Sequence, residues 1–142
     1  MNQEIQALWT GALRSGDYTQ GSGVLKTQTG SFCCLGVLCE LAVQAGVIPP
    51  VAEIKSLDAP DLTIDYQYGS ETGVLPNAVQ EWAGLNDSEG TYEMTDAEMT
   101  ERYGKSWDGA TDYRKTSLIN ANDSYGKSFE QIADLIEEHF SN

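Results

Sequence analysis

The spacing of hydrophobic residues predicts an amphipathic helix at each end of the chain. Over residues 3–14 an apolar stripe recurs every three or four positions, and a Ser-Gly pair stops it. Its members are Ile5, Leu8, Trp9 and Leu13. The second stripe follows Ser128 and Gln131, which have the spacing of a capping box. That stripe consists of Phe129, Ile132, Ala133, Ile136 and Phe140. We therefore expect helices over 3–14 and from about residue 129 to the end.

A third helix is expected at residues 35–45, and it differs from the other two. Apolar side chains cover nearly all of its faces, and only Glu40 and Gln44 offer a polar edge. A helix with this pattern is buried on most sides, so we place it at the centre of the fold. Gly46 ends it, and a Pro-Pro pair at 49–50 prevents its continuation.

Two segments have the pattern of short strands. Residues 24–27 and 31–33 flank a Thr-Gly turn, which predicts a β-hairpin. Residues 62–68 alternate between apolar and polar side chains, as a half-buried strand does, and residues 74–75 are expected to return as a short strand. The sheet predicted from these segments is small and antiparallel.

The rest of the chain supplies shorter elements. Pro76 suits the first turn of a helix that ends at Gly84, and Thr95 with Glu98 has capping-box spacing for a helix to about Tyr103. An apolar segment begins at residue 118 and ends within 120–123. The expected fold is α+β and forms one domain over 1–142. Four or five helices surround the central helix, with one small antiparallel sheet.

Composition narrows the classes of function. The chain has 142 residues, a formal charge of −14 and 40% hydrophobic residues, which indicates a folded, acidic, soluble domain. Direct binding to nucleic acid or to an anionic membrane is excluded, because both need a basic surface. No signal peptide or spanning segment is visible, so a cytosolic location is expected. The acidic excess is local: residues 53–101 hold twelve acids and one base.

The three cysteines do not form a convincing catalytic or metal-binding set. The chain has three cysteines, Cys33, Cys34 and Cys39, and an odd number in a protein of cytosolic type does not indicate a disulfide framework. The only histidine, His139, is distant in sequence from them, so a zinc site is not indicated either. No nucleotide-binding, zinc-protease, calcium-loop or hydrolase motif is present. We expect the thiols to pack in the core, with no catalytic residues, no metal and no cofactor. Because Cys34 begins a helix, a thiol enzyme remains a weaker alternative.

One glycine-rich stretch has the composition of a ligand-binding loop. After the first helix, the chain offers cationic and polar groups among glycines, which let a ligand approach the backbone closely. The candidate ligand-binding residues are Arg14, Ser15, Gln20, Lys26 and Cys34. A second supply of cations consists of Arg102, Lys105, Arg114, Lys115 and Lys127. If the two groups fold against each other, they form a cationic pocket in an acidic protein; the simpler interpretation is a helix stop and a turn.

Four motifs together resemble a widespread group of small proteins encoded by tailed bacteriophages, prophages and some actinobacterial genomes. The motifs are LRSGDYTQGSGVL, FCCLGVLCELA, LPNAVQEWAGL and NANDSYGKSFEQIADLIEE, in that order. The resemblance covers most of the chain but does not extend to roughly residues 50–72 and 88–114. It implies a phage accessory protein in the host bacterial cytoplasm, of the kind that blunts antiviral defence. The shared motifs include Arg14, Gln20 and the helix start at Cys34, but no complete catalytic set.

Two functions follow from these observations. The first is a non-enzymatic binding protein that sequesters a small phosphate-bearing ligand, such as a nucleotide signal. The second is an inhibitor whose acidic residues 53–101 imitate nucleic acid and bind a basic host protein. A homo-oligomer is also compatible with the sequence, with Tyr66, Tyr68 and Trp107 as candidate contact residues. We prefer the first function, capture of a small anionic ligand, to imitation of nucleic acid. The shared motifs lie in the parts of the chain where acids and bases are nearly equal in number, whereas most of the acidic excess lies outside the motifs.

Overall fold

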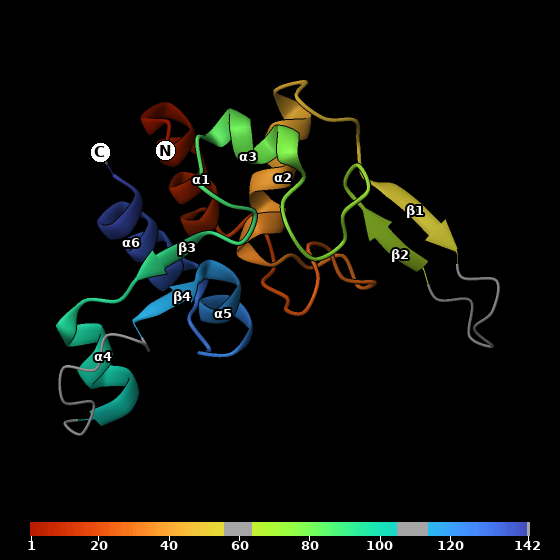
Figure 1. Cartoon of the computed structure of the whole chain (residues 1–142). Helices are drawn as coiled ribbons and strands as arrows, with labels where there is room; N and C mark the ends of the chain where they lie inside the picture. The colour runs from red at the N-terminus through yellow and green to blue at the C-terminus, as the bar shows by residue number, and fades with distance from the viewer. Residues whose placement is uncertain (56–63, 105–113, 142) are drawn as a thin grey trace.

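A computed structural model describes residues 1–55, 64–104 and 114–141 of the chain. These ranges contain six helices and two antiparallel sheets of two strands each (Figure 1). The helices are α1 (Gln3–Arg14), α2 (Cys34–Gln44), α3 (Asn77–Ala83), α4 (Asp96–Tyr103), α5 (Leu118–Asp123) and α6 (Phe129–Phe140). The strands are β1 (Ala52–Lys55), β2 (Ile64–Gln67), β3 (Thr91–Glu93) and β4 (Lys115–Ser117). The fold is therefore α+β, as the sequence predicts.

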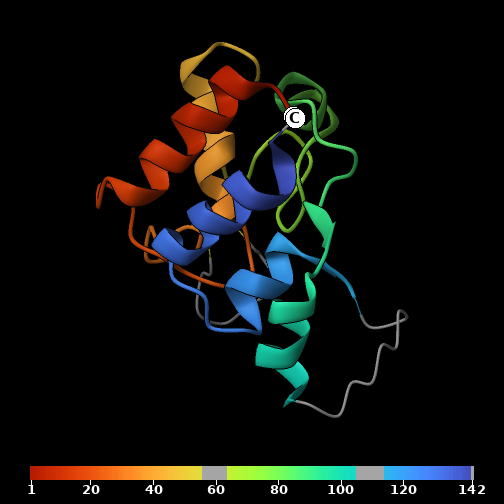
Figure 2. The same ribbon diagram turned by 90° about the vertical axis from the view of Figure 1, so that its left-hand side faces the viewer.

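The central position of α2 is confirmed. Its first six residues are buried, and it packs against α1, α3 and α5. The indole of Trp9 is fully buried and donates a hydrogen bond of 2.9 Å to the carbonyl oxygen of Cys34, which ties α1 to the start of α2. On the other side of α1, helix α6 runs alongside it (Figure 2). Both terminal helices thus bury most of their apolar stripes in one core, but the predicted stripe residue Leu8 is 58% exposed.

Side-chain capping explains where α4 and α6 begin, and a proline without a capping hydrogen bond precedes α3. The Ser128 hydroxyl accepts a hydrogen bond from the backbone amide of Gln131, and the Gln131 side chain accepts one from the amide of Ser128, which confirms the predicted capping box. Pro76 is the N-cap of α3. Thr95 caps α4 by accepting from the backbone amide of Glu98. The Glu98 side chain does not complete a second capping box; it reaches α6 instead.

The β-structure differs from the prediction in three places. In place of the predicted hairpin of two strands over 24–33, Phe32 forms two isolated bridges, an antiparallel one with Lys26 and a parallel one with Gln20. β2 lies within the predicted strand 62–68, whose residues 62–63 are outside the described ranges, and residues 74–75 form no strand. β1 pairs with β2 and β3 with β4, so two separate sheets replace the single sheet expected.

Within the described ranges five helices accompany the central helix α2, which agrees with the expected four or five. The shortest is α5, whose start at Leu118 is capped by the Ser117 hydroxyl. Of the aromatic residues expected to form a contact surface, Tyr68 is fully buried and donates a hydrogen bond of 2.8 Å to Glu40, so it is wrong as a contact residue. Trp107 lies outside the described residues.

No helix within the described ranges combines the length and the apolar character that crossing a membrane requires.

Candidate functional site

The predicted ligand residues at the end of α1 contact other parts of the chain. Arg14 forms ion pairs with Asp134, at 2.7 Å, and with Glu137, both on α6. The Ser15 hydroxyl donates a hydrogen bond of 2.6 Å to the carbonyl oxygen of Ala12. These contacts end α1 and hold it against α6. Arg14 and Ser15 line neither of the two cavities described below.

Gln20 and Cys34 belong to a network around Asn122. The Gln20 side-chain amide donates a hydrogen bond of 2.9 Å to the Asn122 side-chain oxygen and one of 2.8 Å to the backbone oxygen of Lys127. The same Asn122 oxygen accepts from the backbone amide of Cys34. The Cys34 side chain has no exposed surface, and its thiol donates to the carbonyl oxygen of Leu118. These groups connect the loop after α1 to the starts of α2 and α5.

Of the predicted ligand residues, Lys26 alone lines one of the two cavities described among residues 1–55, 64–104 and 114–141. This open hollow of about 460 Å³ lies between residues 22–29 and β2. The Lys26 ammonium lies 4.5 Å from the centre of the Tyr66 ring and 5.5 Å from that of Phe32, so both rings attract it. Asp65 also lines the hollow. The cationic pocket formed jointly by Arg14, Gln20 and Lys26 is therefore not present in the described residues.

The three thiols are buried and protonated. Burial raises the pKa of Cys33 to about 11, and it raises the pKa values of Cys34 and Cys39 further above their usual range. A thiol with such a pKa contains very little thiolate at neutral pH, and thiolate is the reactive form.

We expect the native chain to resist alkylation at neutral pH. Iodoacetamide, followed by intact mass measurement, should label no cysteine in the folded protein and all three after unfolding. Ser124→Cys places a thiol at an exposed position and should be labelled at once, which controls for reagent activity. Rapid labelling of one native cysteine in the unmodified chain would instead support the thiol-enzyme alternative.

A second cavity, of about 380 Å³, lies between α4 and α6. We call it the α4–α6 cavity. Its walls are formed by α4 and α6, by the connection from α5 to α6, and by β3 with the residue that follows β3. The lining residues are Tyr92, Met94, Glu98, Glu101, Arg102, Tyr125, Lys127, Gln131, Asp134, Leu135 and Glu138. The cavity thus combines aromatic and apolar surface with charges of both signs.

Two cations lie on the wall formed by α4 and the α5–α6 connection. The Arg102 guanidinium stacks 3.6 Å from the centre of the Tyr125 ring. Lys127 forms an ion pair of 2.7 Å with Glu101. Among the described residues, Arg102 has no carboxylate within ion-pair distance, so its planar donors remain free to bind an anion.

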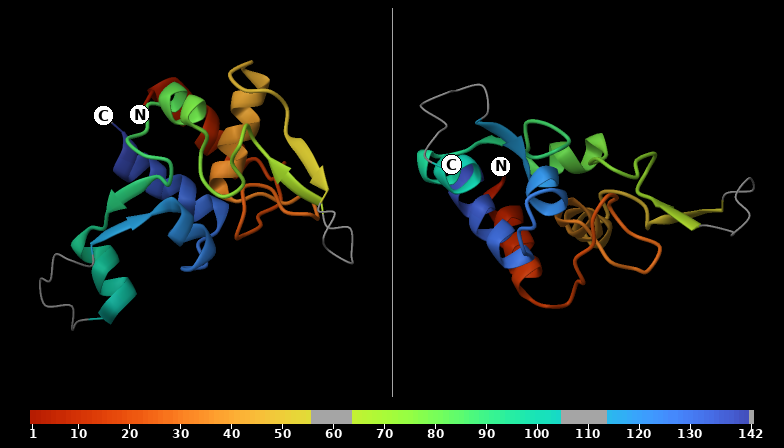
Figure 3. Two further views of the ribbon diagram at one scale, coloured as in Figure 1. Left: turned by 45° about the vertical axis from the view of Figure 1, so that its right-hand side comes forward. Right: turned by 90° about the horizontal axis from the view of Figure 1, so that it is seen from below.

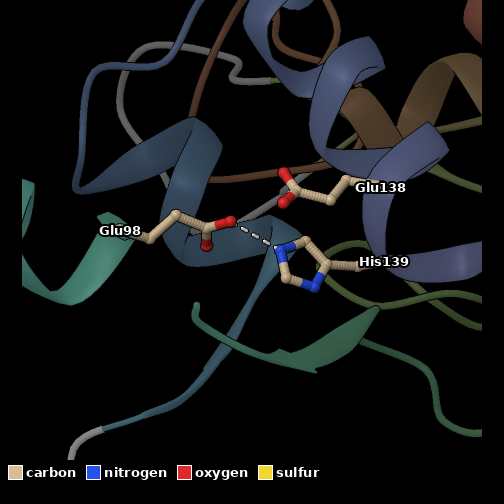
Figure 4. A group of neighbouring side chains, drawn as sticks. All are labelled: Glu98, Glu138 and His139. Carbon is tan, nitrogen blue, oxygen red and sulfur yellow. Dashed lines mark hydrogen bonds and ion pairs between the residues drawn. The ribbon is translucent and has the colours of Figure 1, made fainter. Parts of the chain in front are cut away.

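Beside the cavity lies His139, the only histidine of the chain, next to two carboxylates that do line the cavity, Glu98 and Glu138. His139 Nε2 lies 2.7 Å from a Glu98 carboxylate oxygen, and the Glu138 carboxylate lies close to both (Figure 4). The His139 side chain is 10% exposed, and its ring lies 4.5 Å from the ring of Tyr92. Burial raises the pKa of Tyr92, so its hydroxyl stays neutral. The three ligand atoms lie within 4.8 Å of one another, a spacing at which they are candidates to share one metal ion.

Sequence reasoning did not find this cluster. Glu98 and His139 are 41 positions apart, and no local motif links them. The sequence predicted Glu98 only as a capping residue. It indicates no role for His139, because the cysteines that a catalytic or metal-binding histidine would need lie 100 or more positions away in the chain. The cations Arg102 and Lys127 were named only as a loose secondary group.

Comparison with known proteins identifies the family. The model of the family described as "Domain of unknown function (DUF8296)" matches residues 1–140, so the chain belongs to this family. No curated protein and no solved structure matches the chain.

Proposed function

We propose that this member of the DUF8296 family is a non-catalytic protein that binds a small phosphate-bearing ligand, such as a nucleotide, in the α4–α6 cavity. The observation that carries the proposal is the Arg102 guanidinium stacked on Tyr125, with Lys127 on the same wall. An arginine held flat on an aromatic ring keeps its outer edge available for phosphate oxygens.

The size and lining of the cavity suit such a ligand. A volume of about 380 Å³ falls in the range of small-molecule sites, roughly 300–1,000 Å³. Tyr92, Met94 and Leu135 offer surface on which the flat, largely apolar part of a nucleotide can pack. The buried, protonated thiols argue against a cysteine nucleophile, so binding is favoured over covalent catalysis.

The biological role that fits this proposal is sequestration of a nucleotide-derived defence signal. The resemblance to phage accessory proteins supports this role and a location in the host bacterial cytoplasm. A ligand trap needs no catalytic residues, only a site that retains its ligand.

The alternative, imitation of nucleic acid, needs one continuous acidic face. The acids of residues 53–101 are divided between elements instead: Glu53 is on β1, whereas Glu98 and Glu101 are on α4. These two elements lie at opposite ends of the molecule (Figure 3). Glu98 and Glu101 also form ion pairs with His139 and Lys127. This arrangement favours ligand binding over imitation.

Arg102→Gln is expected to weaken nucleotide binding by at least about tenfold, because it removes a charged hydrogen-bond donor from the phosphate. Isothermal titration calorimetry against cyclic nucleotides and ADP-ribose, with and without Mn²⁺, measures this. Lys115→Gln is the matched control, since Lys115 is exposed and lines neither cavity.

Lys26→Gln tests the competing hollow and should leave binding unchanged. Loss of binding in this variant, with normal binding in Arg102→Gln, would move the site to the hollow. The absence of heat with every nucleotide under both metal conditions, together with no protection of an infecting phage, would contradict the proposed function.

A further inference from the structure

We infer that Glu98, Glu138 and His139 form a binding site for a divalent transition-metal ion, to which the ligand phosphate coordinates. The role given to the phosphate rests on the proposed function, whereas the metal site itself depends only on the three side chains.

The ligand atoms already have nearly the spacing that one ion requires. Metal–ligand bonds to imidazole nitrogen and carboxylate oxygen are about 2.1 Å long, so two neighbouring ligands lie about 3 Å apart and two opposite ones about 4.2 Å apart. His139 Nε2 and the Glu98 oxygen are 2.7 Å apart, and the three ligand atoms lie within 4.8 Å of one another.

Only a small movement is needed to complete the site. Glu138 is exposed, and its carboxylate forms no hydrogen bond or ion pair with another described residue, so it can turn toward the other two ligands. Glu98 and His139 are the better buried members, with side chains 17% and 10% exposed. Two positioned ligands and one adaptable ligand converge from two helices (Figure 4).

The donor set indicates the class of ion. One imidazole nitrogen and two carboxylate oxygens suit Mn²⁺, Fe²⁺ or Zn²⁺, because Mg²⁺ and Ca²⁺ prefer oxygen ligands alone. Three protein ligands leave at least one coordination position open, as in metal sites that bind a substrate. A phosphate oxygen can take that position.

The charge of the α4–α6 cavity supplies an independent reason for a cation. Four carboxylates and two cations line it, so a bound divalent cation would offset the excess of negative charge that opposes a phosphate at Arg102. Lys127 pairs with Glu101, and Arg14 pairs with Asp134 from outside the cavity. The carboxylates left without a cationic lysine or arginine partner are Glu98 and Glu138, the two that would hold the ion.

The metal site is tested on the full chain without any nucleotide. Free Mn²⁺ is measured by electron paramagnetic resonance as protein is added, and Zn²⁺ competition follows. Glu138→Gln and His139→Gln should each weaken Mn²⁺ binding by at least about tenfold, since each removes a ligand. Glu130→Gln removes the same charge from an exposed position on α6 and should bind Mn²⁺ as the unmodified chain does.

The outcomes separate this inference from the proposed function. Mn²⁺ binding that depends on Glu138 and His139, without any nucleotide binding, supports the metal site and contradicts the proposed function. If the chain binds no Mn²⁺, and binds nucleotide equally strongly with and without a chelator, the proposed function is supported and the metal site is contradicted. Equal Mn²⁺ affinity in Glu138→Gln and Glu130→Gln would overturn the metal site and leave Glu98 and His139 as an ion pair joining α4 to α6. Circular dichroism of each variant checks that it is folded.

Discussion

Gly36→Ala is expected to lower the free energy of unfolding by roughly 3 kcal/mol or more, which is enough to unfold a marginally stable domain. Gly36 lies on α2 where the helix passes the backbone of Leu25. An added Cβ would overlap with the Leu25 carbonyl oxygen and lie 2.8 Å from its carbonyl carbon. Neither atom can withdraw easily, because the Leu25 amide donates to Thr72 and its carbonyl accepts from Cys33.

Gly11→Ala is the matched control for this prediction. Gly11 also lies within a helix, α1, but nothing is within 4 Å of the position that its Cβ would occupy. Alanine should stabilise α1 there by up to about 1 kcal/mol, because it forms helix more readily than glycine. Urea unfolding followed by circular dichroism measures both variants. Equal stability of the two would show that α2 does not pack against Leu25.

Asn122→Ala has the second largest expected effect, a loss of about 2–4 kcal/mol of stability. The Asn122 side chain is buried and joins three segments. Its side-chain oxygen accepts hydrogen bonds from the Gln20 side chain and the Cys34 backbone amide. Its side-chain nitrogen donates a hydrogen bond of 2.8 Å to the carbonyl oxygen of Gly21. Alanine would remove the side-chain partner of the buried Cys34 amide and of the half-buried Gly21 carbonyl, whereas Gln20 keeps its hydrogen bond to Lys127. An unpaired buried polar group is costly.

Asn120→Ala serves as the control, because Asn120 lies on the same helix but is exposed. It should change stability by no more than about 0.5 kcal/mol. Thermal unfolding at one protein concentration compares the two variants. A small effect of Asn122→Ala, similar to that of Asn120→Ala, would mean that the network does not hold the loop after α1 in place.

The elements that the sequence predicts well are those with a local cause. The stripes of α1 and α6 and the capping box at Ser128 depend only on residues within a few positions of one another. The sequence gives no such signal for α5, which has only six residues with apolar side chains mainly at its start. β3 and β4 have three residues each and pair across more than twenty intervening positions, so alternation cannot reveal them.

The candidate site was harder to predict for the same reason. Arg14 and Gln20 drew attention as cationic and polar groups near glycines, but their partners Asp134 and Asn122 are over a hundred positions away. Those contacts turn both residues into parts of the scaffold. The pairing of Glu98 with His139 likewise depends on how α4 approaches α6. The Thr95 hydroxyl caps α4, and the Glu98 carboxylate instead binds the histidine.

The most direct test of the α4–α6 cavity as a binding site is a crystal structure of the chain grown with Mn²⁺ and a bound nucleotide, with anomalous diffraction measured for manganese. The expected result is an anomalous peak among Glu98, Glu138 and His139, with phosphate density reaching Arg102. A nucleotide bound in the hollow beside Lys26, with the α4–α6 cavity free of both metal and ligand, would contradict it.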